Sequence, residues 1–555
     1  MKIVECVPNF SEGRDSEKIK AITREIEQTP GVKLLDVDPG ESTNRTVVTF
    51  IGPPEAVKEA AFRAIRQAAE VIDMTRHKGA HSRIGATDVC PFVPVSGVTM
   101  EDCIRLAHEL GHRVAKELGI PVYLYEEAAQ KAERRNLATI RLGEYEGLPE
   151  KLKDPEWAPD YGDPVFNPKS GATVIGAREF LIAYNINLNT RDRRLANEIA
   201  LNLRESGRAK RDAEGNVIKN ADGQAVMVPG KFKHVKAVGW YIEDYGVAQI
   251  SINFTNYKIT PVHVVFDEAV KEAERLGLRV TGSELVGLIP KEALLMAGRY
   301  YLEKQGKSPG LPEEEVIRTA VISLGLNDVA TFDPSKKIIE YQFKEVGPSL
   351  LRLNLREFAN ELSSDTPAPG GGSAAALVAA LSASLAAMVA NLTVGKKGYE
   401  EAEEEMKKVA MMAQQLKDEM LKAVDKDSCA FNRVMDAYRM PKATEEQAKE
   451  REAAVELTSQ GAALVPFGVL EKCAELMEAA KAVAERGNKN SVSDAGVAGL
   501  LAEAAAESAY YNVKINLLNI KDAAFKENIG GRAKGLKEEV ARAAAALRAV
   551  IASHL

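Results

Sequence analysis

The sequence predicts a multidomain protein: two α/β (α+β, ferredoxin-like layered) subdomains followed by an all-α helical bundle. The chain has 555 residues, which is too long for one hydrophobic core. Up to about residue 345, short strand-like runs alternate with segments of 3.6-residue periodicity. Beyond that point Ala, Glu and Lys dominate, and long helical segments follow one another.

Hydrophobic periodicity indicates the order β-α-β-β-α twice in the first part of the chain. In the first module we expect strands at 2–9, 32–40, 45–52, 87–95 and 121–125, and helices at 15–29, 53–72 and 100–118. In the second module we expect strands at 179–188, 235–244 and 247–254, and helices at 193–206 and 260–277. We therefore expect domains at 1–178, 179–327 and 350–555, with a linker at 328–349.

Two polar segments interrupt these modules. The segment 146–173 is rich in Pro and Gly, so we expect a long loop with possible function. The segment 211–231 is an insert that favours a mobile excursion from the second module.

Composition indicates an ordinary globular protein of a reducing compartment. Hydrophobic residues make up 45% and charged residues 28%, and the net charge of −7 argues against a nucleic-acid binder. The five cysteines form no CxxC pair, and the start "MKIVECVPNF" carries no signal peptide, so we expect reduced thiols and a cytoplasmic location. The apolar tract 374–392 is rich in Ala and Ser, which favours a buried bundle helix over a membrane span.

A zinc-protease pattern, His108-Glu109-Leu110-Gly111-His112, lies in the expected helix 100–118. On a helical wheel its histidines fall away from the apolar stripe, beside Arg105 and Lys116. Two nearby cations disfavour a bound dication, and no third ligand follows at a suitable distance. We interpret the pattern as a solvated helix face.

The segment 76–95 is a better candidate for chemistry, because it gathers cations and imidazoles on a loop before a strand. Its polar residues are Arg76, His77, Lys78, His81, Arg83 and Asp88. Arg and Lys suit carboxylate capture, and an imidazole can carry a proton near neutral pH. A structured loop with a hydrogen-bonded His is an equal alternative, whereas Gly79 disfavours a metal pair from His77 and His81.

Two other loops are candidates for the same pocket. One follows the first strand and contains Asn9, Ser11 and Glu12. The other joins two paired strands and contains Asp36, Asp38, Asn44 and Arg45. Turn chemistry alone also explains their Asp, Pro, Gly and Asn residues.

In the helical part, Gly370, Gly371, Gly372 and Ser373 directly precede the Ala-rich helix. A glycine run that opens a helix offers N–H donors to an anion or a polar ring edge, or it is simply a flexible start capped by Ser373. Lys396 and Lys397 follow the helix as possible carboxylate partners or as a solvated pair.

A third candidate in the helical part is the pair Asp425 and Asp427, within an amphipathic helix. Asp427 lies at the edge of the apolar stripe. Held there, a carboxylate acquires a raised pKa and can act as an acid or base, although an exposed helix-face Asp is the default reading.

Several long motifs resemble two known enzyme families. "VECVPNFSEG", "LLDVD", "STNRTV", "RHKGAHSRIGATDVCPF", "AREFLIAYNINL" and "LVGLIPKEALL" are similar to glutamate formimidoyltransferases. "APGGGSAAA", "VDKDSCAF", "MPKAT" and "VKINLLNIKDAAF" are similar to formimidoyltetrahydrofolate cyclodeaminases. Together the motifs cover nearly the whole chain and resemble the bifunctional family that joins both activities.

The resemblance implies a folate enzyme of histidine degradation. The first part would hold tetrahydrofolate between its two subdomains and transfer the formimino group of N-formimidoyl-L-glutamate to N5. The helical part would then form 5,10-methenyltetrahydrofolate and release ammonia. The folate is a co-substrate, possibly polyglutamylated, and neither a metal nor a nucleic acid is implied. The family also forms a homo-oligomer, an octameric ring.

The resemblance assigns residues as follows. The transferase histidine falls on His81 and the cyclodeaminase aspartate on Asp427. Beside these family positions, our own reading of the residues makes Asp38 the orienting partner of His81, and Asn9, Arg45, Lys78 and Arg83 candidates to hold substrate in the transferase, with Lys396 and Lys397 in the cyclodeaminase. The folate-binding loop falls on Gly162, Asp163, Pro164, Val165, Phe166, Asn167, Pro168, Lys169, Ser170 and Gly171.

Departures and alternatives accompany the resemblance. Leu518 and Asn519 stand where the family often has Arg and Asp, and the insert around 212–230 is longer than expected. The alternatives are a helical domain that acts as a methenyltetrahydrofolate cyclohydrolase, N-formylglutamate as the donor, and a non-catalytic folate-binding or cytoskeletal scaffold.

Overall fold

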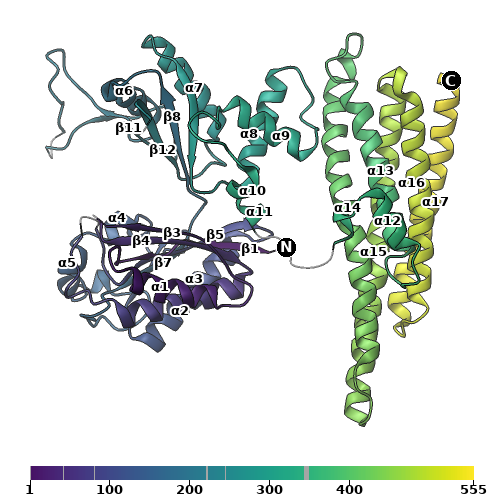
Figure 1. The fold of residues 1–555 in the computed structure, drawn as a ribbon, viewed down its shortest axis with the longest axis horizontal. Helices are drawn as coiled ribbons and strands as arrows, with labels where there is room; N and C mark the ends of the chain where they lie inside the picture. The colour runs from purple at the N-terminus through teal and green to yellow at the C-terminus, as the bar shows by residue number, and fades with distance from the viewer. Residues whose placement is uncertain (1, 42, 80–81, 221–222, 244, 343–348) are drawn as a thin grey trace. The chain divides into compact units, whose positions relative to one another are not determined.

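The fold is known from a computed structural model that describes residues 2–41, 43–79, 82–220, 223–243, 245–342 and 349–555 (Figure 1). Contacts divide the chain into two compact units. The first contains Met1–Leu294 and Leu324–Glu345, and the second contains Leu295–Ser323 and Val346–Leu555. His81 and most of the linker motif 344–350 lie outside the described residues.

A seven-stranded mixed sheet forms the base of the first unit. Its strands are β1 (Ile3–Cys6), β2 (Asn9–Phe10), β3 (Lys33–Gly40), β4 (Arg45–Gly52), β5 (Thr87–Ser96), β6 (Val122–Glu126) and β7 (Thr173–Ala177). The order is β1-β4-β2-β5-β7-β6, with β3 also paired to β4 and β1 to β5. The pairs β5–β7 and β6–β7 are parallel and the others antiparallel.

Three amphipathic helices cover one face of this sheet: α1 (Ser16–Glu27), α2 (Pro54–Val71) and α3 (Met100–Leu118) (Figure 1). Local sequence sets their ends, because Asp15 caps α1, Pro54 begins α2, and Thr99 and Asp102 form a capping box on α3. Their apolar stripes bury Ile26, Ile65 and Leu110 against strand residues such as Phe50.

The segment 146–173 is more ordered than the expected loop. Short helices α4 (Leu137–Ile140) and α5 (Glu144–Lys151), with the 3₁₀ turns η1 (Ala132–Arg134) and η2 (Pro155–Trp157), pack beside β5, β6 and β7. The segment ends by entering β7. The loop prediction was therefore wrong at both ends, because residues 146–151 belong to α5, which accommodates Pro149 in its second half, and Gly and Pro around 162–171 obscured a short buried strand.

The second sheet has four antiparallel strands in the order β11-β12-β8-β13. They are β8 (Ile182–Leu188), β11 (Val235–Ile242), β12 (Val247–Phe254) and β13 (Val280–Val286), accompanied by α6 (Arg193–Leu203) and α7 (Val262–Arg275). The insert is tied together by the two-residue strands β9 (Arg208–Ala209) and β10 (Met227–Val228). The short helices α10 (Pro334–Lys337) and α11 (Ile339–Gln342) complete the unit.

The expected repeat is present, and one further strand follows the second helix of each module: β5, which was expected at 87–95, and β13, which was not expected. The first module runs β1-α1-β3-β4-α2-β5, with spatial order β3-β4-β1-β5. The second runs β8-α6-β11-β12-α7-β13, with spatial order β11-β12-β8-β13. The two modules therefore share one strand order and leave one sheet face free of these helices to form a site.

The second unit is helical. Its elements are most of α8 (Lys291–Lys304), α9 (Glu313–Ser323), α12 (Leu355–Leu362), α13 (Gly371–Asn391), α14 (Glu403–Arg439), α15 (Glu445–Arg486), α16 (Val492–Leu517), α17 (Ala523–His554) and the 3₁₀ turns η3 (Leu350–Arg352), η4 (Glu400–Ala402) and η5 (Lys489–Ser491). Pro466 lies inside α15. The C-terminal region is mostly helical, as expected.

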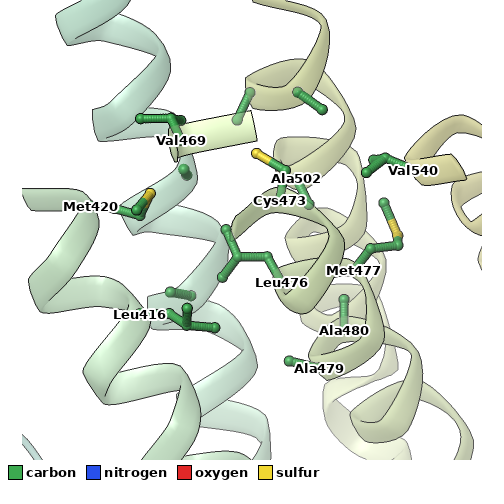
Figure 2. Packing of buried hydrophobic residues seen from close by; sticks show 14 of the residues in the cluster. Leu416, Met420, Val469, Cys473, Leu476, Met477, Ala479, Ala480, Ala502 and Val540 are labelled. Atoms are coloured by element: carbon green, nitrogen blue, oxygen red, sulfur yellow. The ribbon is translucent and has the colours of Figure 1, made fainter. Parts of the chain in front are cut away.

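Alanine lets the bundle helices approach closely, and larger side chains fill the remaining space. Ala383 of α13 and Ala502 of α16 are fully buried. In Figure 2, Leu416 of α14, Leu476 of α15 and Val540 of α17 contribute to the same interior. Such packing is dense enough that volume changes of one methyl group are felt.

In the part of the chain that the structure describes, two helices are long and apolar enough to cross a membrane by length and composition. They are α13, whose most apolar window is 61% buried, and α15, with 39% buried. The Ala-rich tract 374–392 thus forms a bundle helix, as expected, with Ala379, Ala386 and Ala390 in the core.

Candidate active sites

The turn between β3 and β4 packs against the segment that leads to His81. Asn44 donates from Nδ2 to the carbonyl oxygen of Lys78 at 3.0 Å, and its Oδ1 accepts from the N–H of Gly13 at 3.0 Å. Asn44 has a φ of 49°, which Asn tolerates better than most residues. Two of the loops singled out in the sequence are therefore in contact.

His77 is locked in this contact. Its Nε2–H donates to the carbonyl oxygen of Asn44 at 2.9 Å, and its Nδ1 accepts from Arg83 Nε at 3.2 Å. Burial lowers the pKa of His77, and the Arg83 charge lowers it further against the opposing effect of the Asn44 carbonyl. The ring is therefore neutral with both nitrogens occupied, which is the hydrogen-bonded reading of this histidine.

Arg83 is buried and already paired. Its guanidinium contacts Glu146 at 2.6 Å and Glu144 at 2.8 Å, both from α5. The Glu146 hydrogen bond is the main reason that the pKa of Arg83 is raised. A substrate carboxylate would have to displace these partners, so the role of Arg83 supported by this geometry is to hold α5 and His77.

Asn9, Asp38 and Arg45 meet on β4. Both Asn9 of β2 and Asp38 of β3 lie opposite Val47, while Arg45 begins the strand. Arg45 is half-buried, and burial lowers its pKa, as does Arg141, while Asp88 and Asp38 oppose the shift. The structure thus brings Asp38 and Arg45 into one electrostatic group, whereas the Lys78 residue is exposed.

A cavity of about 550 Å³ lies between the two sheets of the first unit. Val47 and Thr49 of β4 line it, so it begins beside the Asp38 position. Ala183 of β8 and Val286 of β13 form part of its other wall. Its place between the modules matches the expected position of a ligand held by both subdomains.

The loop 162–171 lines a different cavity, of about 710 Å³, at the carboxyl end of α3. Its residues Gly162, Asp163, Val165, Phe166, Asn167 and Pro168 face this space. Pro164, Lys169, Ser170 and Gly171 do not line it; Lys169 donates to the carbonyl of Glu70, and Ser170 accepts from the N–H of Ala86. None of the residues of this loop lines the cavity between the two sheets.

The zinc-protease pattern is explained by packing. His108 Nδ1 hydrogen-bonds the Tyr161 hydroxyl at 2.8 Å, and both His108 and His112 lie edge-on to the Tyr161 ring. A side chain at Gly111 would meet this ring at 2.9 Å. His112 is exposed, as expected, but His108 is half-buried against Tyr161 rather than solvated. Within the described residues, no three His, Cys, Asp or Glu side chains are placed to hold a metal.

Gly79→Ala is expected to reduce the transfer reaction that the sequence resemblance implies at least tenfold, and to leave the implied cyclisation unchanged. Its Cβ would lie 2.2 Å from the Thr43 carbonyl oxygen, so the segment before His81 would have to move. Gly147→Ala is the matched control, because nothing lies within 4 Å of its Cβ. Wild-type transfer kinetics for Gly79→Ala would contradict the prediction.

The second site is built around Asp427 of α14. Ser373 directs its backbone N–H and its hydroxyl, at 3.2 Å from Oδ2, toward this carboxyl group. The Ser373 hydroxyl also lies 2.9 Å from the Val424 carbonyl and 3.1 Å from the Ser428 hydroxyl. Burial outweighs these hydrogen bonds and raises the pKa of Asp427. The carboxyl group can therefore keep its proton closer to neutral pH than an exposed Asp.

Asp427 faces a cavity of about 370 Å³ within the helical unit. The polar wall consists of backbone from the glycine run and of amide side chains, and the apolar wall comes from α14. The lining residues are Pro367, Ala368, Gly370, Gly371, Gly372, Phe431, Val434, Met435, Tyr438, Ser459, Ala462, Asn512, Ile515, Asn516 and Asn519. Such a mixed lining suits a flat heterocycle with polar edges.

The four residues expected to bind ligand together do not all line the cavity. Gly370, Gly371 and Gly372 line the cavity, but Ser373 is fully buried beneath it and holds Asp427. Lys396 and Lys397 lie beyond the opposite end of α13, a helix of 21 residues or about 30 Å. Within one chain they do not line the Asp427 cavity, and Lys396 donates to Asn488 Oδ1 at 2.6 Å instead.

Sequence reasoning missed the amide side chains of this cavity. Asn512 and Asn516 are four residues apart on the mostly apolar α16, so they lie on one face of the helix. Two amide side chains spaced four residues apart in a mostly apolar helix could have predicted this polar face from the sequence. Two residues depart from the family pattern here. Asn519, which stands where the family often has Asp, also lines the cavity, whereas Leu518 is exposed.

Gly372→Ala is expected to reduce the cyclisation that the sequence resemblance implies by about two orders of magnitude, because a misplaced reacting group is that costly. An added Cβ would lie 2.1 Å from Asp427 Oδ1 and would push the carboxyl group out of position. Gly535→Ala in α17, where nothing lies within 4 Å, is the control. Unchanged cyclisation kinetics in Gly372→Ala would show that the carboxyl position is unimportant.

The fold joins a mixed α/β unit with a cavity between its sheets to a helical unit with a buried carboxylate in a second cavity, which defines a two-site enzyme. Models of the formiminotransferase domain match residues 3–178 (its N-terminal subdomain) and 183–344, and a formiminotransferase-cyclodeaminase model matches 354–535. The chain belongs to the formimidoyltransferase-cyclodeaminase family.

Individual relatives cover the whole chain or one of its parts. The chain is 46% identical to the formimidoyltransferase-cyclodeaminase of Mus musculus over 547 residues, 98% of each chain. It is 42% identical to the glutamate formimidoyltransferase of Streptococcus pyogenes over 302 residues, 54% of this chain and 94% of that protein. It is 40% identical to a methenyltetrahydrofolate cyclohydrolase of Methylorubrum extorquens over 185 residues, 33% of this chain and 89% of that protein.

Proposed function

We propose that this protein transfers the formimino group of N-formimidoyl-L-glutamate to N5 of tetrahydrofolate and then closes the product to 5,10-methenyltetrahydrofolate, releasing ammonia. Full-length similarity to formimidoyltransferase-cyclodeaminases supports both steps. The observation that carries the proposal is the buried carboxyl group of Asp427, held by Ser373 at the wall of a cavity that suits a flat heterocycle.

In the transfer step, N5 attacks the formimino carbon and forms a tetrahedral adduct. The C–N bond to glutamate then breaks, so N5 must lose a proton and the glutamate nitrogen must gain one. We assign this exchange to His81, with Asp38 as orienting partner. Arg45 and Lys78, together with Asn9, remain the proposed substrate contacts, and Arg83 supports them through His77.

In the cyclisation step, N10 attacks the same carbon while the C–N bond to the departing nitrogen breaks. Ammonia needs a proton as it leaves, and N10 gives one up. Because burial raises the pKa of Asp427, its carboxyl group can donate the first proton and its carboxylate can accept the second. Backbone from Gly370 to Gly372 lines the cavity against which the folate would lie.

The remaining features of the proposal follow from the family. Tetrahydrofolate is a substrate, possibly polyglutamylated, and the loop 162–171 contributes to its binding. Neither reaction step requires a metal. We propose ferredoxin-like modules at 1–178 and 179–327, a linker at 328–349, a cyclodeaminase domain at 350–555, a homo-oligomeric ring and a cytoplasmic location. Lys396 and Lys397 would meet folate only where another site lies near that end of α13.

A cyclohydrolase is the second candidate for the helical domain, because a methenyltetrahydrofolate cyclohydrolase is 40% identical over 185 residues. The two reactions differ in their starting compound. Only a cyclodeaminase releases ammonia from 5-formimidoyltetrahydrofolate.

One experiment tests the whole proposal. The protein is incubated with tetrahydrofolate and formimidoylglutamate, while methenyltetrahydrofolate absorbance, free glutamate and ammonia are followed together. Equal amounts of the three products are expected. Glutamate without ammonia would exclude the second activity, and no glutamate would exclude the first. Turnover of N-formylglutamate in place of formimidoylglutamate would show that the donor is the formyl compound.

A further inference from the structure

Glu5 is a buried acid in the cavity between the two sheets of the first unit. It lies on β1, is only 4% exposed, and lines the 550 Å³ space. The transfer mechanism described above does not use it. A carboxyl group so far from water needs a partner, because an unsatisfied buried charge is among the most costly groups in a protein.

No hydrogen bond to the Glu5 carboxyl group occurs among the residues that the structure describes. Arg178 is its nearest compensating charge, but that guanidinium donates to the Glu179 carbonyl at 3.0 Å and hydrogen-bonds the Tyr125 side chain. Glu340 adds a repulsive charge, and Asp36, Lys336 and Lys337 line the same space. The carboxyl group thus faces a cavity with its acceptor atoms unfilled.

The cavity walls show what kind of partner fits. Apolar side chains line much of the space, among them Val7, Val47, Phe180, Val286 and Leu288. A flat ring can lie between such walls. A carboxylate in the cavity wall then favours a ring whose edge carries two adjacent N–H donors. A 2-aminopyrimidinone edge and a formamidine group both have this pattern.

Strand register separates these two sources. Glu5 lies opposite Ile51 of β4, whereas Asp38 lies opposite Val47. Four residues of strand span about 13 Å. A Glu side chain, a two-ring heterocycle and an Asp side chain together fill this interval. The formamidine group of the donor belongs at the Asp38 end, where the transfer takes place, so it does not reach Glu5.

We propose that Glu5 binds the N3–H and 2-amino edge of the pterin ring, and so directs N5 toward Asp38 and Arg45. This inference rests on the proposed transferase function and adds the residue that determines recognition and orientation of the folate. Burial raises the pKa of Glu5 to about 7, so the free site readily holds a proton that the two-donor edge replaces.

The test measures equilibrium binding of tetrahydrofolate to the full chain, which has two folate sites. Glu5→Gln is expected to weaken one class of site about a hundredfold, as loss of a buried charge-assisted pair does. Wild-type protein should prefer tetrahydrofolate over its 2-desamino-2-methyl analogue at that site, and Glu5→Gln should bind both equally weakly. Affinity of the wild-type site should also fall below about pH 7, where Glu5 is protonated, and this dependence should vanish in Glu5→Gln.

Glu126→Gln is the matched control, because Glu126 is a largely buried acid near Arg178 that does not line the cavity. It should retain both affinity and preference. A preserved preference for the 2-amino group in Glu5→Gln, or a change confined to the KM of formimidoylglutamate, would overturn the assignment. Because binding is measured without turnover, a failed transfer assay would refute the proposed function and leave this result interpretable.

Discussion

Replacing Asp427 with Asn is expected to slow cyclisation of 5-formimidoyltetrahydrofolate by about 10²- to 10⁴-fold, the usual contribution of one acid–base group. Asn keeps the shape of the side chain and can still accept from Ser373, but it can neither protonate the departing ammonia nor accept the proton of N10. Supplied 5-formimidoyltetrahydrofolate and an ammonia readout measure this step alone, and formimino transfer should be unchanged.

Asp425→Asn is the control on the same helix. Asp425 accepts from the Ser349 hydroxyl at 2.6 Å and from the Leu350 N–H at 2.7 Å, so it ties residues 349–350 to α14 and does not line the cavity. Its variant should lose some stability and keep cyclisation. A similar fall in both variants would reduce Asp427 to a structural role.

Unfolding measurements separate loss of chemistry from loss of structure in Asp427→Asn. Because burial raises the pKa of Asp427, the folded protein binds this proton more tightly than the unfolded chain. Wild-type stability therefore falls as the pH rises from the unfolded-state pKa through the folded-state pKa. Asn does not ionise, so the variant should be at least as stable as wild type at neutral pH. Near pH 3, where both side chains are neutral, the two proteins should be alike.

The sequence predicted the parts of the fold that local patterns encode. Alternation marked β4 and β12, capping residues marked α1 and α3, and the alanine-rich tract marked α13. It missed β7, since a five-residue buried strand between glycine-rich turns shows no alternation; the β-branched residues Thr173, Val174 and Ile175 were the available signal.

The candidate sites divide in the same way. Asp427 and the glycine run were predicted because each lies in a long motif that resembles the cyclodeaminase family. Pairing across the fold stayed hidden: Arg83 meets Glu146 of α5, Ser373 lies beneath Asp427, and Lys396 lies beyond the far end of α13. The burial of Glu5 could not be predicted from the sequence. A single Glu in a strand is usually exposed, and only the packing of the two sheets shows that this one is buried.

Replacing His81 with Ala is expected to reduce formimino transfer by about 10²- to 10⁴-fold and to leave cyclisation of supplied 5-formimidoyltetrahydrofolate intact. Glutamate release from formimidoylglutamate measures the first reaction. In wild-type protein the transfer rate should change with pH near neutrality, and this limb of the pH profile should be absent in His81→Ala. Imidazole added to the variant should restore part of the rate.

His77 is the histidine with which His81 must be compared, since both belong to the candidate segment 76–95 and His77 contacts the β3–β4 turn. His77 donates to the Asn44 carbonyl and accepts from Arg83, so neither ring nitrogen can exchange a proton with substrate without breaking the local structure. A His77→Gln variant should therefore lose stability and some rate but keep the neutral limb of the pH profile. The opposite result would be loss of the neutral limb in His77→Gln and its survival in His81→Ala. His77 would then be the proton carrier, and the transferase site would have to be assigned to His77.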